Sequence, residues 1–186
     1  MLHTDWSIMR DKKLFSVQNM VLIAMFTAIL SICSQIAFML PGGVPVTLQT
    51  FSIVLIGIML GPKLGGMSVL LYILMGAVGV PVFSNLHGGL NILVGPTGGY
   101  IIGFLPMVVL TGLGKGKSFV KSIILSVCGL LICHVMGLYM YYVITSTWLL
   151  PSVPLMLAKD ITTTVFAIIF GREISRRVSF LSLSPR

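Results

Sequence analysis

Gly95-Pro96-Thr97-Gly98-Gly99-Tyr100 is a glycine-rich segment within an apolar sequence. Just before it lies Ser84-Asn85-Leu86-His87-Gly88-Gly89-Leu90-Asn91. Both segments fall within residues 64–114, which contain no Asp, Glu, Lys or Arg. An uncharged stretch of this length is typical of a membrane-embedded protein. Irregular backbone at or near membrane depth must be buried in protein or line a cavity, and glycine lets the backbone approach a ligand closely. The sequence therefore predicts a substrate pocket at one face of a bilayer.

The composition agrees with membrane insertion. Hydrophobic residues make up 56% of the 186 residues and charged residues 9%, whereas a soluble domain carries about 25% charged residues. The net charge of +8 does not by itself indicate nucleic-acid binding. The positions of the basic residues along the sequence are more informative than their sum. We expect a single all-α membrane domain over residues 1–186, in the plasma membrane.

The basic residues divide the apolar sequence. They fall in four groups, and between the groups lie apolar stretches of about 50 residues, each long enough for two spans of about 20. If every group is cytoplasmic by the positive-inside rule, six helices follow, with both termini inside and Lys159 as the exception among the basic residues. The predicted spans are 17–40, 47–60, 64–81, 97–114, 119–147 and 154–177. The basic groups are Arg10, Lys12 and Lys13; Lys63; Lys115, Lys117 and Lys121; and Arg172, Arg176, Arg177 and Arg186.

Asp160 is the strongest candidate for a binding residue. It lies inside the sixth span, one to two turns from the outer end, where an ionisable side chain is costly unless it faces a partner or a wet cavity. Lys159 is its neighbour, but adjacent helical residues point about 100° apart, so the pair is not an obvious ion pair. Thr163 lies one turn further in, near the face of Asp160. The alternative roles are a helix cap for Asp160 and snorkelling to the headgroups for Lys159.

Further polar residues flank the predicted outer side. Thr47 opens the second span and could be its N-cap, whereas Gln49, an amide within an apolar helix, needs a hydrogen-bonding partner. His87 and Asn91 are candidate hydrogen-bonding groups in the outer loop. The histidines form no metal-ligand constellation, so neither a metal nor another cofactor is expected.

The sequence around Lys115 nearly matches a phosphate-binding loop but begins with Thr111 and follows a membrane helix instead of a strand. With no ATP site expected, energy for active transport would come from ion coupling or, the better hypothesis, from a partner. No nucleophile elbow or zinc-binding helix motif is found, so an enzyme is not expected.

Several motifs occur in an order that resembles one family. They are VPVTLQT (44–50), LGPKLG (60–65), LYILMGAVGVPVF (71–83), GGL (88–90) and GPTGGYIIGF (95–104). Together they look like BioY, the biotin-binding S component of energy-coupling factor (ECF) vitamin transporters. The resemblance covers about residues 17–177.

The resemblance implies a compact six-helix bundle of the S-component type that binds biotin from the outside. It also implies a T component and a pair of ATPases as partners, with Ala24 and Ala28 on the first helix facing the T component. Family members commonly carry Lys three residues after the Asp of the sixth helix, where this chain has Thr163. The residues expected at the substrate are Thr47, Gln49, Phe83, His87, Gly88, Gly89, Asn91, Gly95, Thr97, Gly98, Gly99, Tyr100, Lys159, Asp160 and Thr163.

The expected binding mode follows from the ligand. A pocket for biotin needs an apolar slot and a few fixed polar groups. We expect Asp160 to bind a ureido N–H of biotin and the backbone of residues 95–99 to close against the biotin ring. Lys159 or His87 would offset the negative charge of the biotin carboxylate. Two alternatives stay open: an S component for another vitamin or a biotin-like ligand, and a small intramembrane enzyme acting on lipid with Asp160 and His87 as acid and base.

Overall fold

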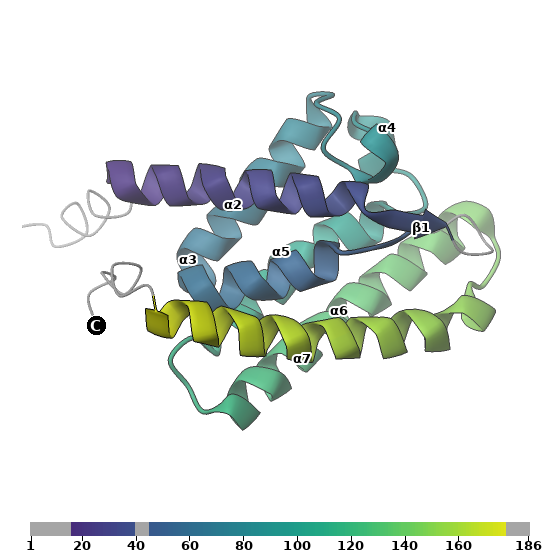
Figure 1. Cartoon of the computed structure of the whole chain (residues 1–186). Helices are drawn as coiled ribbons and strands as arrows, with labels where there is room; N and C mark the ends of the chain where they lie inside the picture. The colour runs from purple at the N-terminus through teal and green to yellow at the C-terminus, as the bar shows by residue number, and fades with distance from the viewer. Residues whose placement is uncertain (1–15, 40–44, 178–186) are drawn as a thin grey trace, which may run out of the picture.

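The computed structural model describes residues 16–39 and 45–177. Helix α2 (Val17–Gln35) is followed by strand β1 (Ala37–Met39), which pairs antiparallel with β2 (Pro45–Thr47) (Figure 1). The predicted first span, 17–40, is therefore wrong at its outer end. The residues of β1 satisfy their backbone through cross-strand hydrogen bonds and leave the helix. Apart from this pair of short strands and an isolated bridge between Phe83 and His87, the described residues are helical or in turns, which confirms the all-α prediction.

Helix α3 (Gln49–Ala77) is a hairpin of two helical arms. At Gly61 the backbone leaves the helical conformation, with φ 83° and ψ −178°, a region that favours glycine, and Pro62 follows. Gln49 Nε2 donates to Tyr72 Oη at 2.7 Å, although 23 residues of straight helix would separate the two by roughly 35 Å. The arms therefore pack against each other, as the predicted pair 47–60 and 64–81 requires.

The outer loop follows the second arm. It contains a short 3-10 turn, η1 (Ser84–Leu86), and one turn of helix, α4 (Leu90–Leu93). Helix α5 (Gly98–Leu113) then crosses behind α3, and the chain returns in α6 (Phe119–Thr145) (Figure 1). A 3-10 turn, η2 (Leu150–Ser152), leads to α7 (Val153–Arg177). These bounds lie within two residues of the predicted spans 97–114, 119–147 and 154–177.

The exposed surface of the helices is apolar. Large hydrophobic side chains are exposed along α2, α6 and α7, for example Met20, Val135 and Phe166. Four helices in the described part of the chain are long and apolar enough to cross a membrane, namely α2, α3, α6 and α7, and α5 is a shorter apolar helix. Contiguous apolar surface of this extent matches lipid rather than water. The chain is therefore a multi-pass membrane protein.

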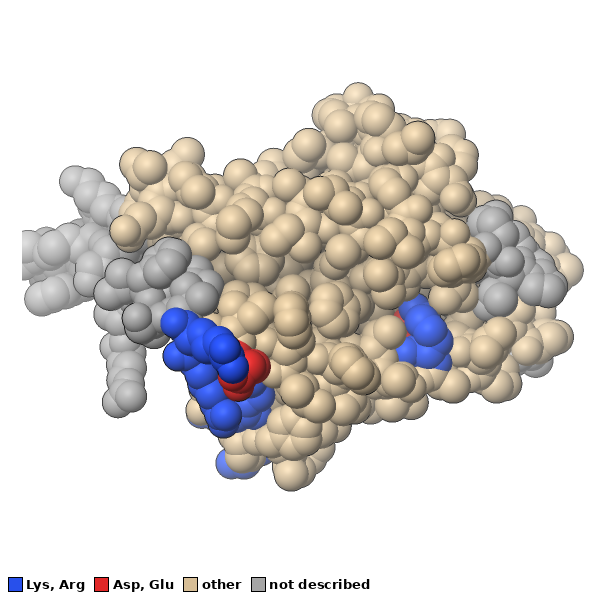
Figure 2. Space-filling view, in the orientation of Figure 1, with Lys and Arg blue, Asp and Glu red and all other residues tan. Residues whose placement is uncertain are grey.

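Charged side chains gather at one end of the bundle, and on the face drawn in Figure 2 a second, smaller group lies over the first half of α7. At the larger group, Arg172 donates to the carbonyl of Lys117 at 2.7 Å and ties α7 to the α5–α6 turn. Gly61 lies at the same end, since a Cβ there would be 3.3 Å from Lys115 Cδ. Burial lowers the pKa of the Lys115 ammonium below its usual range. The predicted basic groups of the α3 turn, the α5–α6 turn and the end of α7 thus come together.

Helix α2 begins and helix α7 ends at this end of the bundle (Figure 1). The tail with Arg10, Lys12 and Lys13, and also Arg186, lies outside the described residues. Their place relative to the membrane stays a prediction.

Candidate functional site

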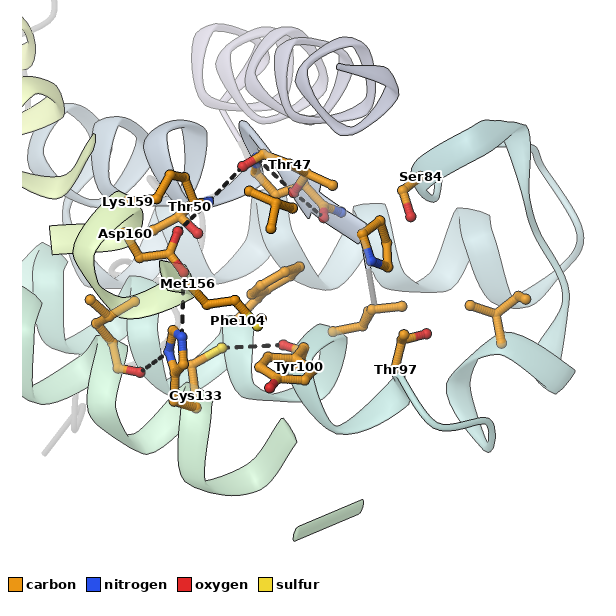
Figure 3. Close-up of a pocket in the computed structure, with 17 residues that line it drawn as sticks. Thr47, Thr50, Ser84, Thr97, Tyr100, Phe104, Cys133, Met156, Lys159 and Asp160 are labelled. Atoms are coloured by element: carbon orange, nitrogen blue, oxygen red, sulfur yellow. Dashed lines mark hydrogen bonds and ion pairs between the residues drawn. The ribbon is translucent and has the colours of Figure 1, made fainter. Parts of the chain in front are cut away.

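A cavity lies between α3, α5, α6 and α7, beneath β2 and the outer loop. Lys159 and Thr47 line it from one side, and Tyr100 and Cys133 face them from the other (Figure 3). Of the predicted substrate residues, six line this cavity: Thr47, Gln49, Thr97, Tyr100, Lys159 and Asp160. The other lining residues are Pro45, Val46, Thr50, Ser84, Ile92, Ile101, Phe104, Leu130, Cys133, His134 and Met156.

Asp160 is the buried charge of the cavity. Only 4% of the residue is exposed, and it lies two turns into α7, so it is not a helix cap. Its Oδ1 pairs with the ammonium of Lys159. The expectation that these neighbours do not pair is wrong, because the long lysine side chain bends back toward the carboxylate from its own position on the helix. A buried carboxylate requires such a partner.

The second oxygen of Asp160 faces a residue of another helix. His134 Nε2 on α6 is 3.4 Å from Asp160 Oδ2, and the histidine is 5% exposed. Its other ring nitrogen, Nδ1, is 3.1 Å from the carbonyl oxygen of Leu130. His134 is the main site residue that sequence reasoning missed. An ionisable side chain in the middle of a predicted span was the available signal.

Lys159 also joins α7 to the strand pair. Its Nζ donates to the carbonyl oxygen of Thr47 at 2.9 Å, and 25% of its side chain is exposed. Lysine thus links the buried carboxylate to the outer edge of the cavity, and it does not simply snorkel to the headgroups. Its ammonium is more accessible than either Asp160 or His134.

Gln49 connects the two arms of α3. Its amide oxygen accepts from the Thr47 hydroxyl at 2.7 Å, and its amide nitrogen donates to Tyr72 Oη. The N-cap position of α3 is Leu48, so the predicted cap at Thr47 is one residue off. The Thr47 hydroxyl nevertheless accepts the backbone N–H of Gln49 at 3.2 Å. Buried Gln49 has the hydrogen-bonding partner that its place in an apolar helix requires.

Tyr100 forms part of the opposite wall. Its ring makes an edge contact with His134, with centroids 5.8 Å apart, and its carbonyl accepts from the Cys133 thiol at 3.4 Å. Gly137 on α6 leaves the space that the ring fills, because a Cβ there would be 2.4 Å from ring atoms of Tyr100. The Tyr100 hydroxyl is buried with no hydrogen-bond partner among the described residues. It can therefore bond to a molecule that enters the cavity.

The other predicted substrate residues do not line the cavity. Most belong to the outer loop or to helix packing, and their role at a ligand stays a prediction. Phe83 is buried in an edge contact with Tyr72 and fills the space beside Gly76. His87 and Asn91 are exposed, and Thr163 donates back to the carbonyl of Lys159 at 3.0 Å. Backbone packing explains most of the predicted glycines, because a Cβ on each would meet a main-chain carbonyl: Gly88 that of Val80, Gly95 that of Asn91, Gly98 that of Leu93, and Gly99 that of Met136. Gly89 instead has a positive φ of 103°.

A side chain of α2 holds the outer loop in place. Gln35 Oε1 accepts the backbone N–H of Leu86 at 2.9 Å, and Gln35 Nε2 donates to the Phe83 carbonyl at 3.1 Å. Ser34 adds a bond to the Val82 carbonyl. Because Asn85 and Leu86 both have φ 58°, which is uncommon for residues other than glycine, the loop needs such support. No sequence pattern indicates this contact, because it joins residues about 50 positions apart.

Comparisons with known proteins agree on one family. The model of the BioY family matches residues 9–180. The biotin transporter BioY2 of Lactococcus lactis is 34% identical over 178 residues, which cover 90% of this chain and 96% of that protein. A probable biotin transporter BioY of Pyrococcus horikoshii is 45% identical over 116 residues, or 62% of this chain and 69% of the relative.

The fold has a solved counterpart. It resembles the crystal structure of the S component for biotin from an ECF-type ABC transporter with a TM-score of 0.77 and 24% sequence identity, over 86% of this chain and 92% of that one. Because the family model spans nearly the whole sequence and the Lactococcus lactis relative is matched over almost its full length, the chain belongs to the BioY family.

Proposed function

We propose that the chain is a biotin-binding S component of an ECF-type transporter and takes part in biotin uptake. The observation that carries the proposal is the buried carboxylate of Asp160, paired with Lys159 in a cavity of mixed apolar and polar lining, in a BioY-family protein. Biotin has a ureido group with two N–H donors and one carbonyl, an apolar bicycle and an apolar chain that ends in a carboxylate. A cavity that combines apolar walls, such as Ile101, Phe104 and Leu130, with fixed polar groups suits such a ligand.

The polar groups of the cavity can be matched to those of biotin. Asp160 has accepting capacity beyond its two charged neighbours, because a carboxylate offers about four lone-pair sites, and it accepts a ureido N–H. Gln49 and the unpaired hydroxyl of Tyr100 supply further polar contacts. Lys159, whose ammonium is the most accessible charge of the cavity, faces the ligand carboxylate. His87 and Asn91 are exposed in the outer loop and contribute less.

The membrane topology proposed is six crossings with both termini in the cytoplasm. The hairpin at Gly61 supports it, because the two arms of α3 then cross separately. The gathering of basic residues near the α3 turn, the α5–α6 turn and the end of α7 supports a cytoplasmic location for that end, because the positive-inside rule places basic residues there. The cavity then opens toward the outside, and the membrane is the plasma membrane.

The partners proposed are a T component and an ATPase pair, with lipid around the remaining helix surface. Ala24 and Ala28 are both exposed on α2, and small residues four apart allow another helix to approach closely. Replacing both by leucine is expected to leave biotin affinity unchanged and to disrupt assembly with the T component in a co-purification experiment. Intact assembly would show that this face is not the contact.

The experiment that tests the function is equilibrium binding of labelled biotin to the purified protein, with desthiobiotin, lipoate and thiamine as competitors. Saturable binding displaced by biotin and desthiobiotin only is expected. Preferential displacement by lipoate or thiamine would assign the chain to another vitamin. The relatives reported above are named as transporters, not enzymes, and turnover of lipid by the purified protein would be needed to revive the enzymatic alternative.

A further inference from the structure

The charges of the cavity do not balance once an anion enters it. Two groups in its described lining can carry a positive charge, Lys159 and His134, and one carries a negative charge, Asp160. Lys159 and Asp160 cancel each other in the structure. A buried ligand carboxylate would then leave a net charge of −1 in a low-dielectric site, which is strongly unfavourable.

The geometry of His134 provides the missing positive charge. One ring nitrogen faces the carbonyl oxygen of Leu130 at 3.1 Å and the other faces Asp160 Oδ2 at 3.4 Å. Both facing atoms are acceptors, and a neutral imidazole has only one N–H to donate. Either neutral tautomer therefore leaves a ring lone pair directed at an oxygen, whereas the imidazolium donates to both.

Few other ionisable groups can supply or compete for that proton. From α7, Lys159 and Asp160 face the ring region, and from α5 Tyr100 makes its edge contact. Cys133 is the neighbour of His134 on α6 and donates to the Tyr100 carbonyl. From α3, the cavity receives Gln49 and Thr50, which do not ionise. Since Tyr and Cys are ordinarily uncharged at neutral pH, the proton belongs to the cluster of Lys159, Asp160 and His134.

We infer that His134 is a specificity-determining residue: in the loaded cavity it is an imidazolium paired with Asp160, and this pairing releases Lys159 for the ligand carboxylate. The inference rests on the proposed function and deepens it. Four charges then pair two by two, His134 with Asp160 and Lys159 with the ligand. The accessible lysine is the partner suited to move, because its side chain is 25% exposed against 6% for each of the other two. The cavity accordingly favours an anionic ligand over its neutral analogue.

The first test observes the proton directly in the wild-type protein. The chain has three histidines, so ring nitrogen-15 NMR spectra of the biotin-saturated protein at pH 8 are simple, and His134→Gln assigns the signal. Both ring nitrogens of His134 are expected to be protonated. A singly protonated His134 in the loaded protein would overturn the inference and leave the proposed function standing.

The second test measures what the proton does for affinity. His134→Gln is expected to weaken binding of biotin by about tenfold or more, and to weaken binding of the neutral biotin methyl ester clearly less. An equal loss for both ligands would mean that His134 only packs against Tyr100, which contradicts the inference. Absence of biotin binding to the folded wild-type protein would overturn the proposed function and the inference together.

Discussion

Helix α7 carries a carboxylate near each end, and the two lie in opposite environments. Asp160 is 6% exposed in its side chain and is enclosed by Lys159 and His134, whereas Glu173 is 48% exposed and pairs with Arg177, whose side chain is 78% exposed. Thirteen residues, or roughly 20 Å of helix, separate them. We therefore propose that the same chemical group serves binding where it is buried and contributes little where water screens it.

The largest effect is expected at the buried carboxylate. Asp160→Asn keeps the shape of the side chain but leaves Lys159 and His134 without their anionic partner and removes the acceptor for the ureido group. Biotin affinity is expected to fall at least about tenfold, equivalent to about 1.4 kcal/mol or more, in an equilibrium binding assay. Unchanged affinity would remove Asp160 from the binding site.

The wall opposite Asp160 can be tested without changing any charge. Gly137→Ala places a methyl group where the Tyr100 ring lies, since the added Cβ would be 2.4 Å from it, so the ring must move at the cavity. We expect biotin affinity to fall by about tenfold, because a misplaced wall costs both packing and a polar contact. Gly66→Ala is the matched control, as its Cβ would meet only Val109 at 3.6 Å. Equal biotin affinities of the two variants would contradict the placement of Tyr100 in the wall of the biotin-binding cavity.

The outer loop should give a smaller effect. Gln35→Ala removes the side chain that holds Leu86 and Phe83, and each lost hydrogen bond is worth about 1 kcal/mol. Dissociation of biotin is expected to be about fivefold faster, with faster hydrogen exchange at the Leu86 amide. The exposed Gln18 at the other end of α2 provides the control in Gln18→Ala. An unaltered Leu86 exchange rate would show that Gln35 does not hold the loop.

The smallest effect is expected at the exposed carboxylate. Glu173→Gln repeats the carboxylate-to-amide change on the same helix, but the ion pair with Arg177 at 2.8 Å lies in water. The free energy of unfolding should change by less than about 0.5 kcal/mol, measured by thermal denaturation in detergent, and biotin affinity should not change. A loss comparable to that of Asp160→Asn would mean that the two ends of α7 do not differ as proposed.

The sequence predicts the helices well because membrane insertion imposes long apolar stretches with basic residues between them. It cannot predict the strand pair after α2, since Ala37–Met39 are as apolar as the helix before them and their pairing with Pro45–Thr47 depends on the whole fold. Asp160 could be singled out from the sequence because an ionisable side chain within a membrane span is energetically costly, which can be recognised from a single residue. The contacts of Asp160 with His134 and of Gln49 with Tyr72 depend on how helices are placed side by side, which periodicity does not specify.

The glycines show the same limit. Their number in the outer loop favoured a ligand contact, but Gly98 and Gly99 are buried against carbonyls of Leu93 and Met136. Glycine permits close approach of any backbone, and the sequence alone does not distinguish a ligand from a neighbouring helix. Among the residues that line the cavity, Cys133 and His134 lie outside every motif recognised in the sequence.

The most direct test of the account is an experimental structure of the protein with biotin bound. Biotin is expected in the cavity between α3, α5, α6 and α7, with a ureido nitrogen within hydrogen-bonding distance of Asp160 and the carboxylate beside Lys159. Biotin bound elsewhere, for example among His87 and Asn91 on the outer loop and away from Asp160, would contradict the account.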